Sequence, residues 1–217
     1  MTGADRYATE RGGAVTQVIA RRVALRLMAG GGLVGGLLTV VGCGSSGRGS
    51  GDLAGSAINA DAGSPGDLIR VVAPADRRPA PPLAGPAVAG GRFDLSSWRG
   101  SPVVVNVWGS WCGPCKEEQP ALVKAAAQLA PRGVRFLGID VRDQAANARA
   151  HLRRFGVNYP SLDDPPGALL LGFRGIIPAA AIPSTVVLDR EHRVAGVRIG
   201  AVTQATLVAL VEQALAA

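Results

Sequence analysis

The chain has 217 residues, is 47% hydrophobic and 18% charged, and carries a formal net charge of +7. This length and composition suit one globular domain with accessory segments. Arginine supplies most of the positive charge, but no dense basic stripe with interleaved aromatic residues appears. We therefore expect no nucleic-acid partner.

Residues 1–42 have the pattern of a signal peptide. Five arginines come first, and an uncharged apolar run follows from Leu27 to Val41, shorter than the roughly 20 residues of a membrane-spanning helix. The stretch from Leu38 to Cys43 resembles a bacterial lipobox, which implies cleavage before Cys43 and lipid attachment to its thiol. We expect a lipid-anchored protein on the extracytoplasmic face of the cell membrane. The alternative is an uncleaved N-terminal anchor with a spare thiol.

Residues 43–91 are predicted to contain the lipid-anchor site and a flexible tether. Residues 44–66 are rich in Gly, Ser and Ala, and a proline-rich stretch covers residues 79–86. Between them, the apolar run 68–72 predicts one edge strand. The folded domain is expected to begin near Arg92 and to span residues 92–217.

Hydrophobic patterns predict an α/β order within residues 92–217. A near-continuous apolar run from Val103 to Trp108 is typical of a central strand that is buried on both faces. Asp143 and Thr203 are expected to be helix N-caps. The other predicted strands are 93–95, 134–140, 160–162, 184–189 and 194–199, and the predicted helical segments are 96–100, 112–130, 143–154, 167–173 and 203–216. This order predicts a mixed central sheet flanked by helices, with a βα insert.

Residues 111–115 read Trp-Cys-Gly-Pro-Cys directly after the predicted central strand. Two cysteines at this spacing can close and reopen a disulfide. Cys112, expected to be exposed at a helix N-terminus, is the candidate attacking thiolate, and the more buried Cys115 is the candidate resolving thiol.

Half a zinc site is the alternative use of two such cysteines, but zinc needs four ligands. The chain has no second CxxC motif. His151 and His192 are expected to be ordinary surface residues. We expect neither a metal nor a cofactor.

Ile182-Pro183 precedes another apolar strand. Together with the WCGPC motif, it resembles the thioredoxin superfamily, which implies a thioredoxin-like fold. The resemblance also implies that Pro183 is cis and faces the disulfide, and that the backbone around Ile182 pairs with substrate chains. Trp111, Gly113 and Pro114 are the further candidate substrate-binding residues.

The domain also resembles the TlpA/ResA/CcmG-like branch of membrane-tethered thiol–disulfide reductases. The residues that carry this resemblance are the lead-in 93–108, the CxxCxxExP pattern of 112–120 and the insert near 158–178. It implies that Glu118 is an acidic group close to the dithiol, able to exchange a proton with Cys115. Asn106 stands where thioredoxins carry a buried acid, which favours this role, although a solvated helix carboxylate is the alternative. Glu117 is expected to face solvent.

The resemblance implies a reductase of exported protein disulfides, with apocytochrome c as one candidate client. A membrane electron donor of the CcdA/DsbD type would re-reduce it. Two alternatives stay open: an oxidase that forms disulfides, and a module that binds a metal or a metallochaperone through the two thiols. A peroxidase is less favoured, because the peroxide-reactive cysteine of that family belongs to another motif.

Overall fold

The computed structural model describes residues 68–216. The predicted signal peptide, Cys43 and the first part of the predicted tether lie outside these residues. In chain order the elements are β1 (Leu68–Val71), η1 (Pro74–Asp76), β2 (Ala84–Pro86), β3 (Arg92–Asp94), η2 (Leu95–Trp98), β4 (Val103–Trp108), α1 (Gly113–Leu129), η3 (Ala130–Arg132), β5 (Arg135–Val141), α2 (Ala145–Phe155), β6 (Ser161–Asp164), α3 (Ala168–Gly172), β7 (Ser184–Leu188), β8 (Val194–Ile199) and α4 (Gln204–Ala216).

A mixed sheet of six strands, in the order β1-β8-β7-β4-β5-β6, forms the centre of the fold. Strand β4 is parallel to β5 and antiparallel to β7. All six residues of β4 are buried, which explains why its sequence is an apolar run rather than an alternating pattern. The predicted α/β fold with a mixed central sheet is confirmed.

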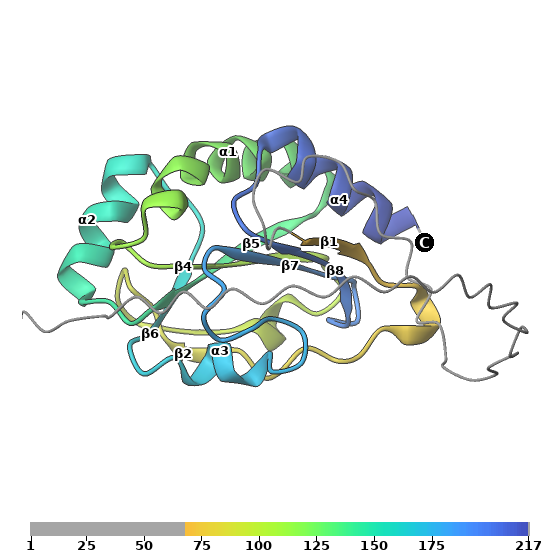
Figure 1. Cartoon of the computed structure of the whole chain (residues 1–217), viewed down its shortest axis with the longest axis horizontal. Coiled ribbons are helices and arrows are strands. Elements are labelled where there is room, and N and C mark those ends of the chain that lie inside the picture. Colours follow the sequence, from red (N-terminus) through yellow and green to blue (C-terminus); the bar gives the residue numbers. More distant parts are fainter. Residues whose placement is uncertain (1–67, 217) are drawn as a thin grey trace, which may run out of the picture. The chain divides into compact units, whose positions relative to one another are not determined.

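Helices α1 and α4 cover one face of the sheet, and α3 lies against the other face with the short β2–β3 hairpin (Figure 1). Two hydrophobic clusters fill the two interfaces. The first, with α1 and α4, includes Val104, Leu122, Phe136, Val187, Leu207 and Leu210. The second includes Val105, Leu137, Ile139, Leu170, Phe173 and Ile177.

The folded domain begins earlier than the sequence predicts. Strand β1 is an edge strand that pairs with β8 from Leu68 opposite Ile199. Farther along, Arg77 donates to the backbone oxygens of Val72 and Ala214 and pairs with the Asp189 carboxylate. These long-range contacts fix residues 68–91 on the domain, so the prediction of a tether there is wrong, whereas the edge strand is confirmed.

The two predicted helix caps differ in outcome. The Thr203 hydroxyl accepts a hydrogen bond from the Thr206 amide, as expected of an N-cap for α4. Helix α2 begins at Ala145, after Gln144 as N-cap, so the prediction for Asp143 is wrong. The Asp143 carboxylate instead accepts from the Ser110 amide at 2.6 Å. It therefore holds the loop that precedes Cys112.

Candidate active site

Cys112 and Cys115 are joined by a disulfide at the N-terminus of α1, with their Cα atoms 5.3 Å apart. Cys112 is the N-cap, and its Sγ accepts a hydrogen bond from the Cys115 amide at 3.2 Å. After reduction, the same amide and the positive end of the helix dipole favour a thiolate at Cys112.

Both cysteines are buried, which corrects the expectation that Cys112 is exposed. Cys112 retains 5% of its accessible surface and Cys115 retains 1%. The reason is packing, because the two sulfurs belong to a small hydrophobic cluster with Val88, Trp108 and Ala148. Gly113 and Pro114 between them are exposed, so a substrate chain can approach the disulfide from this side.

Pro183 follows a cis peptide bond from Ile182, as the resemblance implies. Ile182 packs both against the cluster around Cys112 and Cys115 and against the larger core on the α3 side of the sheet. The structure therefore places the cis-proline segment beside the disulfide. Ile182 is half-buried and Pro183 is buried.

Glu118 is buried, with 2% of its surface exposed, which excludes the alternative of a solvated carboxylate. Its Oε1 accepts from Asn106 Nδ2 at 2.9 Å, and its Oε2 accepts from the Val202 amide at 3.0 Å. Burial raises the pKa of Glu118 to about 8, and the two hydrogen bonds and the charge of Arg198 only partly oppose the rise. This carboxyl can therefore hold a proton at neutral pH. Its neighbour Glu117 is exposed, as predicted.

Trp111 is 52% exposed and forms part of the surface beside the disulfide. Its indole Nε1 donates to the Val141 carbonyl at 3.2 Å, and the Arg142 guanidinium lies 5.6 Å from the ring centroid. Gly109 leaves the space that the ring needs, since a Cβ there would lie 2.6 Å from Trp111 Nε1.

Sequence reasoning missed a buried polar group that packs on Trp108, a member of the cluster that contains the two cysteines. His151 is 5% exposed and stacks on Trp108, with ring centroids 4.5 Å apart. Burial lowers its pKa to about 4, helped by the charge of Lys116, so the ring is neutral at physiological pH. The only available signal was its position three residues after Ala148, on one face of α2.

The prediction that both histidines are surface residues is wrong. His192 is 8% exposed, and its Nε2 lies 3.2 Å from the Trp98 carbonyl oxygen. It adopts a left-handed backbone conformation, with φ at 59°. This turn directs the ring into the domain rather than into solvent.

Asp140 is a second buried acid that the sequence did not single out as functional. It lies opposite Trp108 in the β4–β5 register and is fully buried, and neither carboxyl oxygen has a hydrogen-bond partner within residues 68–216. Burial raises its pKa to about 8, with further contributions from the neighbouring Asp143, Asp163 and Asp164. It is therefore protonated at neutral pH.

Within residues 68–216, no group of three or more His, Cys, Asp or Glu side chains is arranged to hold a metal ion. The same residues contain no helix that is both long and apolar enough to cross a membrane.

Comparison with known proteins identifies the family. The pattern of the AhpC/TSA family matches residues 77–197, which is more than half of the chain. The chain belongs to the AhpC/TSA family.

Curated relatives carry the name thiol-disulfide oxidoreductase ResA. The Bacillus subtilis protein is 27% identical over 118 residues, which cover 54% of this chain and 64% of that protein. The protein of Geobacillus thermodenitrificans is 29% identical over 110 residues, covering 51% of this chain and 61% of that protein. The chain thus spans somewhat less than two thirds of these relatives. The resemblance to the ResA branch is confirmed.

Solved structures show the same fold. A DsbF homologue from Corynebacterium diphtheriae is 29% identical, with a TM-score of 0.63 over 70% of this chain and 96% of that one. A secreted thiol-disulfide isomerase from Corynebacterium glutamicum is 30% identical, with a TM-score of 0.64 over 73% of this chain and 96% of that one. The predicted thioredoxin-like fold is confirmed.

Proposed function

We propose that this protein is a thiol–disulfide oxidoreductase that reduces disulfides in exported proteins while anchored to the membrane through Cys43. The observation that carries the proposal is the Cys112–Cys115 disulfide at the N-terminus of α1, packed beside the cis-Pro183 segment. The names of the relatives, thiol-disulfide oxidoreductase and thiol-disulfide isomerase, support the same chemistry.

The reaction begins with the reduced dithiol. The Cys112 thiolate attacks one sulfur of the client disulfide, forms a mixed disulfide and displaces the other client sulfur as a thiolate. The Cys115 thiol then loses its proton and attacks Cys112 Sγ. This step releases the second client thiolate and closes the Cys112–Cys115 disulfide, so two electrons pass from the protein to the client.

Glu118 is the proposed proton acceptor for Cys115, acting through the minor fraction of the carboxyl that is ionised at neutral pH. It lies three residues farther along α1, on the same face of the helix. Its pKa of about 8 is close to the value of about 8.5 of an unperturbed thiol. A proton can pass between two groups of similar pKa at little free-energy cost. Asn106 and the Val202 amide hold the carboxyl in place throughout.

A variant assay tests the catalytic proposal. Purified protein with Cys112→Ser should fail to reduce insulin disulfides in the presence of dithiothreitol, whereas wild-type protein turns over. The same assay with hydrogen peroxide as acceptor measures peroxidase activity in parallel. Undiminished insulin reduction by the variant would refute the role of Cys112.

The direction of electron flow needs its own measurement. A reductase should equilibrate with glutathione at a potential closer to the roughly −270 mV of thioredoxin than to the roughly −120 mV of the strong oxidant DsbA. A potential near the DsbA value would favour the alternative of a disulfide-forming oxidase. Stoichiometric copper in anaerobically purified protein would instead favour the metal-binding alternative.

The client, the electron donor and the anchor are also part of the proposal. A Cys115→Ala variant should retain clients as mixed disulfides, and capture of a protein with a CxxCH motif would support apocytochrome c as client. Loss of a CcdA/DsbD-type membrane protein should leave the dithiol oxidised in cells. A Cys43→Ser variant should lose its lipid, detected by mass spectrometry of the N-terminal peptide, and leave the membrane fraction.

A further inference from the structure

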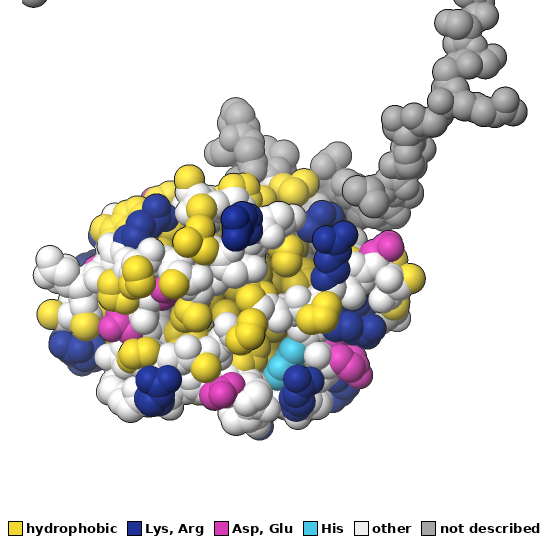
Figure 2. Space-filling model, turned by 90° about the horizontal axis from the view of Figure 1, so that it is seen from below, with side chains coloured by type: hydrophobic (Ala, Val, Ile, Leu, Met, Phe, Trp, Pro, Cys, Tyr) yellow, Lys and Arg dark blue, Asp and Glu magenta, His cyan; other side chains and the backbone are white. Residues whose placement is uncertain are grey.

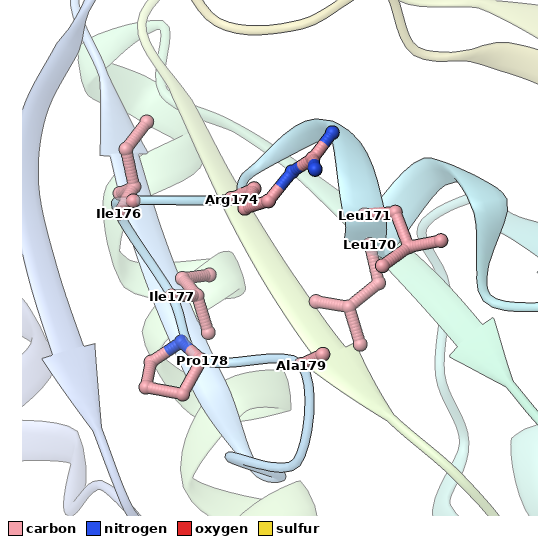
Figure 3. A pocket seen from close by; sticks show the side chains of 8 residues that line it. Leu170, Leu171, Arg174, Ile176, Ile177, Pro178 and Ala179 are labelled. Carbon is pink, nitrogen blue, oxygen red and sulfur yellow. The ribbon is translucent and has the colours of Figure 1, made fainter.

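An apolar hollow of about 320 Å³ lies between α3 and the loop that leads to the cis-proline segment. Figure 3 shows its walls, with α3 on one side and the loop on the other. The aliphatic side chains that line it are Leu170, Leu171, Ile176, Ile177 and Pro178. Leu171 is 52% exposed although it is a large hydrophobic residue. An open apolar site of this kind is a feature of interaction surfaces.

Two sets of contacts link the hollow to residues around the disulfide. Ala179 lines the hollow, and its carbonyl accepts a hydrogen bond from Arg142 Nη2 at 3.3 Å. The guanidinium of Arg142 also lies 5.6 Å from the ring of Trp111, the residue before Cys112. In addition, Ile182 packs on the same core as Leu170 and also on the cluster of the two cysteines. Arg142 therefore connects one end of the hollow with the exposed Trp111 beside the disulfide.

Two arginines flank the hollow. Arg174 lies at one end of it (Figure 3) and is exposed, and within residues 68–216 it forms no salt bridge. Arg142 lies beyond Ala179 at the other end. Among the described residues, no Asp or Glu lines the hollow. In Figure 2, hydrophobic side chains extend across the middle of the face that α3 occupies, with both basic and acidic side chains around them. A partner with an apolar side chain next to a carboxylate would complement this surface.

We propose that this hollow is a client-binding subsite of the reductase, a proposal that rests on the function proposed above. The occupant is an extended segment of an exported client, on either side of its cysteine. A bulky aliphatic or aromatic side chain of that segment enters the hollow, and an acidic residue next to it faces Arg174. The volume of the hollow suits a single large side chain with its backbone rather than a whole helix.

The experiment uses the purified full chain in its reduced form and synthetic peptides linked as symmetric disulfide dimers. Each peptide has one cysteine and one leucine. The leucine stands two to six residues from the cysteine, with one peptide for each position. The residue after the leucine is Asp in one series of peptides and Lys in the other. The controls have glycine in place of leucine. Oxidation of the Cys112–Cys115 dithiol, with release of two peptide thiols, is followed by tryptophan fluorescence. At the best position, leucine should raise kcat/KM about tenfold over glycine through burial in the hollow. Peptides with Asp after the leucine should have a higher kcat/KM than peptides with Lys there.

Two variants assign these preferences to the hollow. Leu171→Ser should remove the leucine preference by raising KM, and Arg174→Glu should reverse the preference for Asp over Lys. Leu68→Ser is the matched control for the first variant, because Leu68 is 42% exposed on the edge strand β1. Arg149→Glu, an exposed position on α2, is the control for the second. Both controls should behave as wild type.

Glutathione disulfide, which has no side chain to fill the hollow, separates the two proposals. All four variants should reduce it at the wild-type rate. Wild-type reduction of glutathione disulfide without any peptide preference would overturn the subsite and leave the proposed function intact, whereas no reduction of any disulfide would overturn both. A leucine preference that survives Leu171→Ser also overturns the subsite. So does a dimer in sedimentation velocity that Leu171→Ser dissociates, since the occupant is then a second copy of this chain.

Discussion

Replacing Glu118 by glutamine should flatten the dependence of stability on pH. Burial raises the pKa of Glu118 from 4.5 to about 8. Between these values the folded protein holds a proton that the unfolded chain releases, so the free energy of unfolding falls as pH rises. The slope for one such group is about 1.4 kcal/mol per pH unit, which amounts to about 5 kcal/mol over the whole interval.

Two other groups decide where the slope is best measured. Asp140, whose pKa is raised from 3.8 to about 8, adds an equal negative slope. His151, whose pKa is lowered from 6.5 to about 4, adds a positive slope that is halved at pH 6.5 and fades above it. Between pH 7 and 7.5 the slopes of Glu118 and Asp140 therefore dominate. Wild-type stability should fall there by about 2 kcal/mol per pH unit, and Glu118→Gln should remove about half of this slope.

Urea unfolding of the oxidised protein, followed by circular dichroism at several pH values, provides the measurement. Glutamine retains the shape of the protonated acid, and the Asn106 amide can turn over to accept a hydrogen bond from it. Glu117→Gln removes the same charge from the exposed neighbour and should leave the wild-type slope unchanged. A wild-type slope in Glu118→Gln would mean that Glu118 is ionised in the folded protein, and would refute the reasoning.

In the same urea measurements, Asp140→Asn should remove the other half of the fall in the free energy of unfolding with rising pH. It should also stabilise the protein at pH 8. Gly138→Ala should lower the free energy of unfolding by about 1–3 kcal/mol, because the new Cβ would overlap Ser161 Oγ and lie 2.8 Å from Trp108 Nε1. Trp108→Phe should lower it by about 1–3 kcal/mol, because Ser161 loses the hydrogen bond that Trp108 Nε1 donates at 2.9 Å. His151→Ala should lower the melting temperature by several degrees, since the ring stacked on Trp108 is lost.

The elements that the sequence predicted correctly are those whose signal is local. The buried strand β4 appears as an unbroken apolar run, and its predicted and observed bounds coincide. The WCGPC motif and the Ile182-Pro183 pair locate the two sides of the site, because each needs particular residue types at a fixed spacing. Glu118 followed from the CxxCxxExP pattern that carries the resemblance to the TlpA/ResA/CcmG-like branch.

The features that were missed depend on contacts between distant segments. The Gly- and Pro-rich composition of residues 68–91 favours irregular structure, and only pairing with β8 and the contacts of Arg77 bring this segment into the domain. His151 is buried because Trp108 lies under it. Asp143 is a normal N-cap residue type, but its carboxylate binds the amide of Ser110, which is 33 residues away in sequence.

The first cysteine to react in the reduced protein identifies the attacking thiol. The reduced protein would be alkylated with limiting iodoacetamide across a range of pH, and the modified residue identified by mass spectrometry. We expect Cys112 to be modified first, with an apparent pKa below the value of about 8.5 for a free thiol, since it caps α1. Preferential modification of Cys115, or a Cys112 pKa at or above that of a free thiol, would contradict this expectation.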